Sequence, residues 1–342
     1  MMDACAEAKE SIEFENFIFT ADVIGNQFIE VCALKASQGV RVRFIWDAAG
    51  SFSFFGSSIA EELRKKNIEL VFFKTLLPEF FSLHNYRSWY FRNHRRTLVI
   101  DGKIGFTGST CISKRMERWR DTSVRIEGPV VKEMQDSFER MWTRAHGKRP
   151  PHLKQRDSKT DGEFEYVTSM PLPGKRELYS RVLEAVRGSE KSIFITVPYF
   201  VPTQKLARVL RLAAHRGVDV RLILPANSDF PTVDLGARTF FHSMLKGGIR
   251  IFLYKGNMIH TKSIVIDDAW GTVGTLNLDH ISLLYNFEAN LVTTNVRFIE
   301  ELASHFEEDL KQCQEMTLEE WNRRFFVEKV ATFFVKFIRI FL

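Results

Sequence analysis

The chain repeats one order of predicted elements, once near its start and again in its second half. Residues 1–73 and 178–254 each hold a helical run, an apolar strand, a second helical run that ends in Gly-Val, and two more apolar strands. The matching strands are 12–19 with 193–200, 41–47 with 219–225, and 68–73 with 249–254. Strands that alternate with helices of this size indicate βαβ units. Each half is therefore predicted to be α/β, with a mostly parallel mixed sheet flanked by helices.

Four segments are expected along the chain. The first half is predicted to span 1–145 and the second half 163–316, and a C-terminal amphipathic helix is predicted for 317–342. Residues 146–162 are charged, hold two prolines and show no hydrophobic period, which is typical of a linker.

Each half also carries the same short pattern of His, any residue, a base, four residues and Asp. The pattern supplies the predicted catalytic residues His94, Arg96 and Asp101 in the first half, and His260, Lys262 and Asp267 in the second. A glycine and a hydroxyl residue follow each pattern, as Gly108-Ser109 and Gly274-Thr275, and Asn277 follows the second. A lone His before an apolar strand is usually an ordinary half-buried residue. Two such patterns at matching places in repeated halves are hard to obtain by accident.

Side-chain alternation divides each motif between two faces. The residues after each His are apolar and mostly β-branched, which predicts a strand, and alternate side chains of a strand point to opposite faces. His and the base, at i and i+2, therefore share one face. Asp101 and Asp267, at i+7, are expected on the other face, with a structural role near a turn such as Asp101-Gly102.

The paired motifs suit chemistry on a phosphodiester. Two cations and several polar donors stabilise charge on the non-bridging oxygens. One imidazole can attack phosphorus and form a phosphohistidine, while the other acts as general acid and base. We expect no cofactor and no metal, because a cation two residues from each His would repel a divalent ion. The four cysteines match neither a zinc pattern nor a disulfide framework.

Beyond the motifs, longer strings resemble the phospholipase D superfamily and, within it, the bacterial cardiolipin synthases. The strings are 119–129 (WRDTSVRIEGP), 198–202 (PYFVP), 216–221 (RGVDVR) and 286–288 (NFE). The resemblance implies two similar halves packed around one shared active site. It implies that Ser109, Thr275 and Asn277 line the phosphate pocket, and that Asp121 and Glu288 hold the imidazoles by their second nitrogens. By analogy, His94 is the nucleophile and His260 the acid and base.

The first motif departs from the family pattern at two positions. Arg96 stands where the pattern has Lys, and Arg is larger and presents a fixed fork of donors. Cys111 stands in the first half at the position of Asn277, so one amide donor is missing. We therefore expect an asymmetric site.

The activity that the resemblance implies is phosphatidyl transfer between two phosphatidylglycerol molecules, which gives cardiolipin and glycerol. Three alternatives stay open at this point: a phospholipase D that uses water as acceptor, a nuclease of the same superfamily, and a non-catalytic membrane-binding protein. No nucleic-acid partner is expected, and the sequence leaves the oligomeric state open.

A lipid substrate requires access to a bilayer, and the C-terminus offers a candidate contact. Lys329, Thr332, Lys336 and Arg339 share one helical face, opposite a face of Phe, Val, Ile and Leu, which is typical of an interfacial helix. The alternative is that the Phe stripe packs on the body. A second greasy stretch, 76–81 (LLPEFF), either lines acyl-chain entry or caps the core. With no signal-peptide pattern and no uninterrupted apolar run, we expect a peripheral protein of the inner membrane.

Overall fold

The computed structural model describes residues 1–54, 57–73, 91–148, 150, 162–324, 329–330, 332 and 334–335. The predicted LLPEFF loop, most of the predicted linker and most of the apolar C-terminal segment lie outside these ranges. The domain boundaries placed in the linker therefore stay a prediction. Within the described ranges, no helix has the length and apolar character needed to cross a bilayer.

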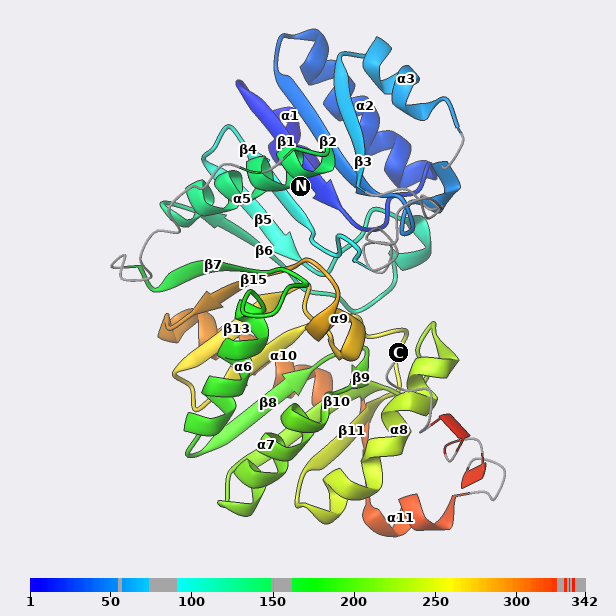
Figure 1. The fold of residues 1–342 in the computed structure, drawn as a ribbon, viewed down its shortest axis with the longest axis vertical. Coiled ribbons are helices and arrows are strands. Elements are labelled where there is room, and N and C mark those ends of the chain that lie inside the picture. Colours follow the sequence, from blue (N-terminus) through cyan, green and yellow to red (C-terminus); the bar gives the residue numbers. More distant parts are fainter. Residues whose placement is uncertain are drawn as a thin grey trace.

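The first half is built on a six-stranded sheet with strand order β3-β2-β1-β4-β5-β6 (Figure 1). β1, β2 and β3 are parallel neighbours, and β4, β5 and β6 follow as antiparallel neighbours. Its elements are α1 (Met2–Ala6), β1 (Ser11–Asn16), α2 (Val23–Ser37), β2 (Arg41–Asp47), η1 (Phe52–Phe54), α3 (Ile59–Lys65), β3 (Ile68–Phe73), β4 (Thr97–Ile100), β5 (Ile104–Gly108), η2 (Lys114–Met116), β6 (Ser123–Glu127) and α5 (Val130–Ala145).

The second half is built on an eight-stranded sheet with strand order β16-β11-β10-β8-β12-β13-β15-β7. Its elements are β7 (Phe164–Ser169), α6 (Glu177–Gly188), β8 (Ser192–Thr196), β9 (Phe200–Val201), α7 (Gln204–His215), β10 (Asp219–Pro225), α8 (Pro231–Lys246), β11 (Arg250–Tyr254), β12 (Ser263–Ile266), β13 (Trp270–Gly274), β14 (Leu278–Asp279), α9 (His280–Leu284), β15 (Glu288–Thr293), α10 (Val296–Leu310), β16 (Cys313–Met316) and α11 (Leu318–Arg323).

The two sheets share a six-strand core, which confirms the predicted repeat. Strands β1, β2, β3, β4, β5 and β6 correspond to β8, β10, β11, β12, β13 and β15, and β7 and β16 extend the edges of the second sheet. Both sheets are mixed, as expected, but the parallel share is smaller than predicted. Parallel pairing stops after the first three strands because β4 and β12 pair with β1 and β8 in the antiparallel direction. Each motif then forms a tight hairpin, β4-β5 or β12-β13, and a short turn joins only antiparallel strands.

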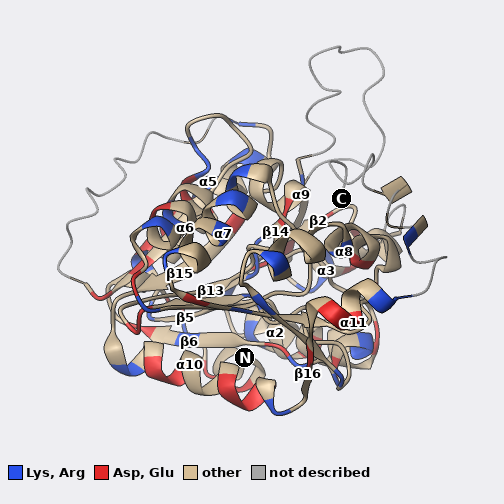
Figure 2. Cartoon of the chain, turned by 90° about the horizontal axis from the view of Figure 1, so that it is seen from below, with Lys and Arg blue, Asp and Glu red and all other residues tan. Residues whose placement is uncertain are grey.

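The predicted helix stops lie where the sequence places them. Gly39 and Gly217, in the two Gly-Val pairs, have positive φ angles of 91° and 93°, which glycine adopts without steric cost. At the start of α2, the Asp22 carboxylate accepts hydrogen bonds from the amides of Ile24 and Gly25 at 3.0 and 3.1 Å. Helices cover both sides of the strands, with α5, α6 and α7 on one side and α10 on the other (Figure 2).

The halves pack against each other through their motif hairpins and last strands. A cluster of buried apolar side chains joins them, with Val99 and Val124 from the first half and Val265, Val273 and Leu291 from the second. Two short parallel bridges also link the halves, one between Asn93 and Phe287 and one between Arg120 and Ile259. The segments just before the two His motifs therefore lie at the contact between the halves.

Candidate active site

The two motif histidines sit at the contact between the halves, each just ahead of the first strand of its hairpin. His94 is 6% exposed and His260 is 4% exposed, and both bases beside them are buried. As parity predicts, each His and its base at i+2 lie together. In each motif the base contacts the imidazole Nε2 atom, at 3.1 Å for Arg96 Nη2 and 3.0 Å for Lys262 Nζ.

Each imidazole is held by a carboxylate of the opposite half. His94 Nδ1 lies 3.0 Å from both carboxylate oxygens of Glu288, and His260 Nδ1 lies 3.0 Å from Asp121 Oδ2. The expected type of partner is therefore present, and the two pairs cross between the halves. Since a carboxylate only accepts, Nδ1 carries the proton in both rings, and Nε2 holds the lone pair of a neutral imidazole.

Backbone pairing explains why the partners cross. The amide of His94 donates to the carbonyl of Phe287 at 3.0 Å, which places the following residue, Glu288, beside the His94 ring. In the same way, the amide of His260 donates to the carbonyl of Arg120 at 2.8 Å, and Asp121 follows. Two backbone bridges between the halves thus set both imidazole–carboxylate pairs.

The two hydroxyl residues bind the carboxylates. Ser109 Oγ donates a short hydrogen bond to Asp121, and Thr275 Oγ1 donates to Glu288 Oε2 at 2.5 Å. Ser282, which the sequence did not single out, also donates to Glu288. Ser109 and Thr275 therefore support the partners of the imidazoles, and their contact with a phosphate stays a prediction.

The positions of Asn277 and Cys111 differ between the halves. Asn277 is 4% exposed and its amide oxygen has no hydrogen-bond partner among the described residues. Cys111 is 5% exposed and its sulfur accepts a hydrogen bond from Arg96 Nε at 3.0 Å. The predicted asymmetry of the site is therefore present in the contacts of its side chains.

Asp101 and Asp267 lie away from the imidazoles, at the turns of the hairpins. The Asp101 carboxylate accepts from the amides of Lys9, Glu10 and Ser11, and Asp267 accepts from the three amides of residues 190–192. Both residues have positive φ angles, 53° and 54°. These contacts agree with the parity argument for a structural role near a turn, and a catalytic role of Asp101 and Asp267 stays a prediction.

Three aromatic rings surround the imidazoles. Phe17 meets His94 edge-on at 4.9 Å between ring centroids, and Trp119 and Tyr199 lie 5.4 and 6.4 Å from His260. The Tyr199 hydroxyl donates to Asp229 at 2.6 Å. Trp119 and Tyr199 lie in strings that carry the family resemblance, whereas Phe17, in an apolar strand pattern, offered no signal that separates it from the core.

Burial controls the protonation of the site. Burial, opposed by Glu288 and assisted by the charge of Arg96, lowers the pKa of His94 to about 4. Burial and the charge of Lys262 lower the pKa of His260 to about 3. Burial and the charge of Arg96 lower the pKa of Lys262 to about 7. Both imidazoles are therefore neutral near pH 7, and Lys262 titrates there.

A family model described as "Cardiolipin synthase, PLD-like domain" matches residues 1–142 and 182–310, which include both motifs and both partner carboxylates. The chain belongs to this family. It is 31% identical to a cardiolipin synthase of Clostridium perfringens, over 99% of this chain and 73% of the relative. It is 32% identical to a cardiolipin synthase of Geobacillus kaustophilus, over 95% of this chain and 66% of the relative.

Solved structures of other proteins have the same fold as this chain. A phosphatidylserine synthase from Haemophilus influenzae superposes with a TM-score of 0.74 at 13% identity, covering 100% of this chain and 92% of that one. A polyphosphate kinase from Porphyromonas gingivalis superposes with a TM-score of 0.63 at 12% identity, covering 100% of this chain and 51% of that one. These similarities show a shared arrangement of two phospholipase D-like halves.

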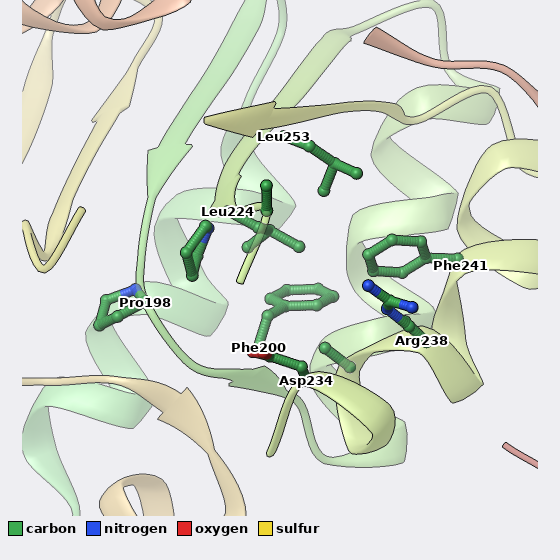
Figure 3. Close-up of a pocket in the computed structure, with 10 residues that line it drawn as sticks. Pro198, Phe200, Leu224, Asp234, Arg238, Phe241 and Leu253 are labelled. Atoms are coloured by element: carbon green, nitrogen blue, oxygen red, sulfur yellow. The ribbon is translucent and has the colours of Figure 1, made fainter. Parts of the chain in front are cut away.

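The surroundings of the site add two observations. A small, mostly apolar pocket of the second half lies beside the segment that carries Tyr199 and contains none of the motif residues; Figure 3 labels its lining residues Pro198, Phe200, Leu224, Asp234, Arg238, Phe241 and Leu253. In the part of the chain that the structure describes, no group of three or more His, Cys, Asp or Glu side chains could hold a metal ion.

Proposed function

We propose that this protein is a cardiolipin synthase. It transfers a phosphatidyl group from one phosphatidylglycerol molecule to the hydroxyl of a second, and it releases glycerol. Family membership supports this activity. The observation that carries it is the pair of buried, neutral imidazoles, each set between a carboxylate of the other half and a cation of its own.

The resting contacts support a role for the substrate phosphate in freeing the nucleophile. Each Nε2 lone pair accepts a hydrogen bond from a cation, which weakens it as a nucleophile or base. A bound phosphodiester is anionic and attracts both cations. Arg96 would then move its Nη2 hydrogen bond from His94 to a phosphate oxygen, and Lys262 would donate to the phosphate while it keeps its contact with His260 Nε2, so that both cations stabilise the charge of the transition state.

In the first step, the Nε2 lone pair of His94 attacks phosphorus and forms a phosphohistidine. The bond from phosphorus to the glycerol oxygen breaks, and that oxygen takes a proton from His260. Lys262 supplies the proton to His260, since its Nζ lies 3.0 Å from His260 Nε2 and its pKa is lowered to about 7 by burial and the charge of Arg96.

In the second step, a hydroxyl of the second phosphatidylglycerol gives its proton to His260, which returns it to Lys262, and the resulting oxygen attacks phosphorus. The phosphohistidine bond breaks, cardiolipin leaves, and His94 is restored. Glu288 and Asp121 stabilise the charge that develops on the imidazole rings, because each accepts the Nδ1 proton. Water in place of the second lipid would give phosphatidic acid.

We assign the protein to the surface of the inner membrane, with the C-terminal segment as one contact. Residues 329, 330, 332, 334 and 335 are helical. Thr332, on the predicted polar face, is buried, whereas Val330 and Phe334 are 37% and 65% exposed. Lys329, on the same predicted face as Thr332, is exposed, so the segment presents both apolar and basic side chains, as contact with an anionic membrane surface requires.

The deciding experiment is incubation of the purified full-length protein with phosphatidylglycerol vesicles, followed by separation of the lipids. We expect cardiolipin and glycerol in equal amounts from the wild type and no product from His94→Asn. When the protein is denatured at alkaline pH, where a phosphohistidine bond persists, His260→Asn incubated with labelled lipid should retain label on the protein at His94. Phosphatidic acid without cardiolipin would identify a hydrolase, and cleavage of DNA without lipid turnover would identify a nuclease.

A further inference from the structure

Lys262 and Arg96 each contact the ring and the carbonyl oxygen of their histidine, but Lys262 uses one nitrogen and Arg96 uses two. Lys262 uses one nitrogen, Nζ, for both the Nε2 atom and the carbonyl oxygen of His260, at 3.0 and 2.9 Å. Arg96 uses two nitrogens, Nη2 for the Nε2 atom and Nη1 for the carbonyl oxygen of His94, at 3.1 and 3.0 Å. Arg96 therefore reproduces the contacts of Lys262 and keeps a third nitrogen for another partner.

That third nitrogen binds the residue that stands in place of the second-half amide. Arg96 Nε donates to Cys111 Sγ at 3.0 Å, and both side chains are buried. In the second half, the amide oxygen of Asn277 accepts no hydrogen bond from the described residues. The two departures from the family pattern, at positions 96 and 111, thus lie in direct contact.

The contact with sulfur fixes the plane of the guanidinium group. A guanidinium has five N–H groups, and the three contacts of Arg96 use one on each nitrogen. One N–H remains on Nη1 and one on Nη2. These two N–H groups are available to donate to phosphate oxygens, and Arg binds phosphate through more than one nitrogen whereas Lys binds it as a point charge.

The side-chain sizes at positions 96 and 111 also depend on each other. Phe17 lies against the guanidinium, with 5.9 Å from the Arg96 Cζ atom to the ring centroid, so the group is enclosed on that side. An asparagine at 111 carries its amide atoms one bond farther out than a cysteine carries its sulfur. In a close-packed interior such an extension displaces the neighbour, which here is Arg96.

We infer that Cys111 is a positioning residue for the transfer reaction. It orients Arg96 so that two N–H groups donate to one phosphodiester. Arg96 and Cys111 form a matched pair, and replacing only one of them by its second-half counterpart, Lys or Asn, should lower activity. This inference rests on the proposed function, because it assigns these two N–H groups to the phosphate of the lipid that His94 attacks.

The test is a set of variants assayed on phosphatidylglycerol, with kcat and KM determined separately. Cys111→Ser keeps an acceptor and should stay within about twofold of the wild type. Cys111→Ala loses the acceptor and should lower kcat/KM about tenfold, and Cys111→Asn should lower it further because it displaces Arg96. Arg96→Lys is assayed alone and together with Cys111→Asn; the double variant recreates the second-half pair and should restore at least tenfold over Cys111→Asn alone.

A matched control separates positioning from the loss of a buried thiol. Cys32→Ala removes a buried thiol of α2 outside the site, and it should lower the melting temperature without changing kcat. The inference is overturned if Cys111→Ala has wild-type kinetics, or if the double variant is no more active than the product of the single effects predicts. Should the wild type release phosphatidic acid only, the proposed function fails, while the same variants still test the positioning of Arg96 on hydrolysis.

Discussion

At the scale of single residues, burial determines the protonation of the imidazoles and the ammonium group in the site. Both imidazoles are neutral near pH 7 because burial lowers their pKa values to about 4 and about 3. Lys262, whose pKa burial and the charge of Arg96 lower to about 7, is the group of the three that changes charge near neutrality. The charge of the cation in the second motif is thus lost as the pH rises.

The pH profile of kcat/KM should therefore have its alkaline limb near pH 7. Below that value Lys262 is charged and supplies both the proton and the phosphate contact, and above it the charge is lost. In Lys262→Arg the charge persists, so the alkaline limb should move up by at least two pH units even if the rate is lower. An unchanged limb in this variant would assign the titration to another group.

At the scale of elements, the two motif hairpins have turns of the same kind, each with an Asp that binds three backbone amides. Asp101 and Asp267 each gather three backbone N–H groups that lead into the first strand of their half, β1 or β8. Each turn therefore joins the motif hairpin to the start of its half-sheet. Burial alone would raise the pKa of both carboxyl groups, but the hydrogen bonds from the amides lower it.

Removing either turn carboxylate should cost stability and leave the chemistry intact. Asp101→Asn and Asp267→Asn tolerate the positive φ angle but weaken charge-assisted bonds, so each should cost on the order of 2 kcal/mol in the free energy of unfolding. Because the folded-state pKa is lowered, this stabilisation is present above the unfolded pKa near 3.8 and is lost as pH falls below it. Denaturant unfolding and kcat at a stabilising temperature check both parts; a large fall in kcat of the folded protein would contradict the structural role.

The sequence could predict these elements because they follow from local rules. Alternation placed His94 beside Arg96 and turned Asp101 away, and the repeat predicted the matching strands. The crossing of the carboxylates could not be predicted, because it depends on backbone bridges between segments such as Asn93 and Phe287. Likewise, the binding of Ser109 to Asp121 depends on the pairing of β5 with β6, which no spacing in one motif encodes.

At the scale of the whole molecule, each half depends on the other to orient its motif imidazole. Each half contributes one imidazole and the carboxylate that orients the other one. Further ties run across the same contact, including Arg120 Nε, which donates to Asp309 Oδ1 at 2.7 Å. The imidazoles therefore become oriented only when the two halves pack against each other.

The crossing predicts a long-range effect in nuclear magnetic resonance spectra. With labelled histidine, Glu288→Gln should shift or abolish the downfield Nδ1 proton signal of His94 and leave that of His260 in place. Asp121→Asn should do the reverse, because each carboxylate accepts from the ring of the other half. If each variant instead perturbed the histidine of its own half, the crossed arrangement would be wrong.

Membrane binding should depend on the C-terminal segment. A chain ending at Arg324 loses the exposed Val330 and Phe334 together with the basic residues of that segment. We expect at least a tenfold weaker association with vesicles that contain phosphatidylglycerol, measured by flotation, since both apolar contact and charge are lost. Turnover of a short-chain, dispersed substrate should persist, and equal loss in both assays would place the segment in the fold of the site.

The crossed pairs also have a consequence for biosynthesis. His94 and Glu288 are separated by 194 residues, so the first imidazole leaves the ribosome long before its carboxylate exists. At about 5–20 residues per second, that interval lasts roughly 10–40 s. During this time the nascent chain carries a phosphate-binding motif whose ring has no fixed tautomer and no opposing acid. We therefore expect a ribosome-bound product that ends before Glu288 to be inert toward lipids, because its His94 ring lacks the carboxylate that orients it.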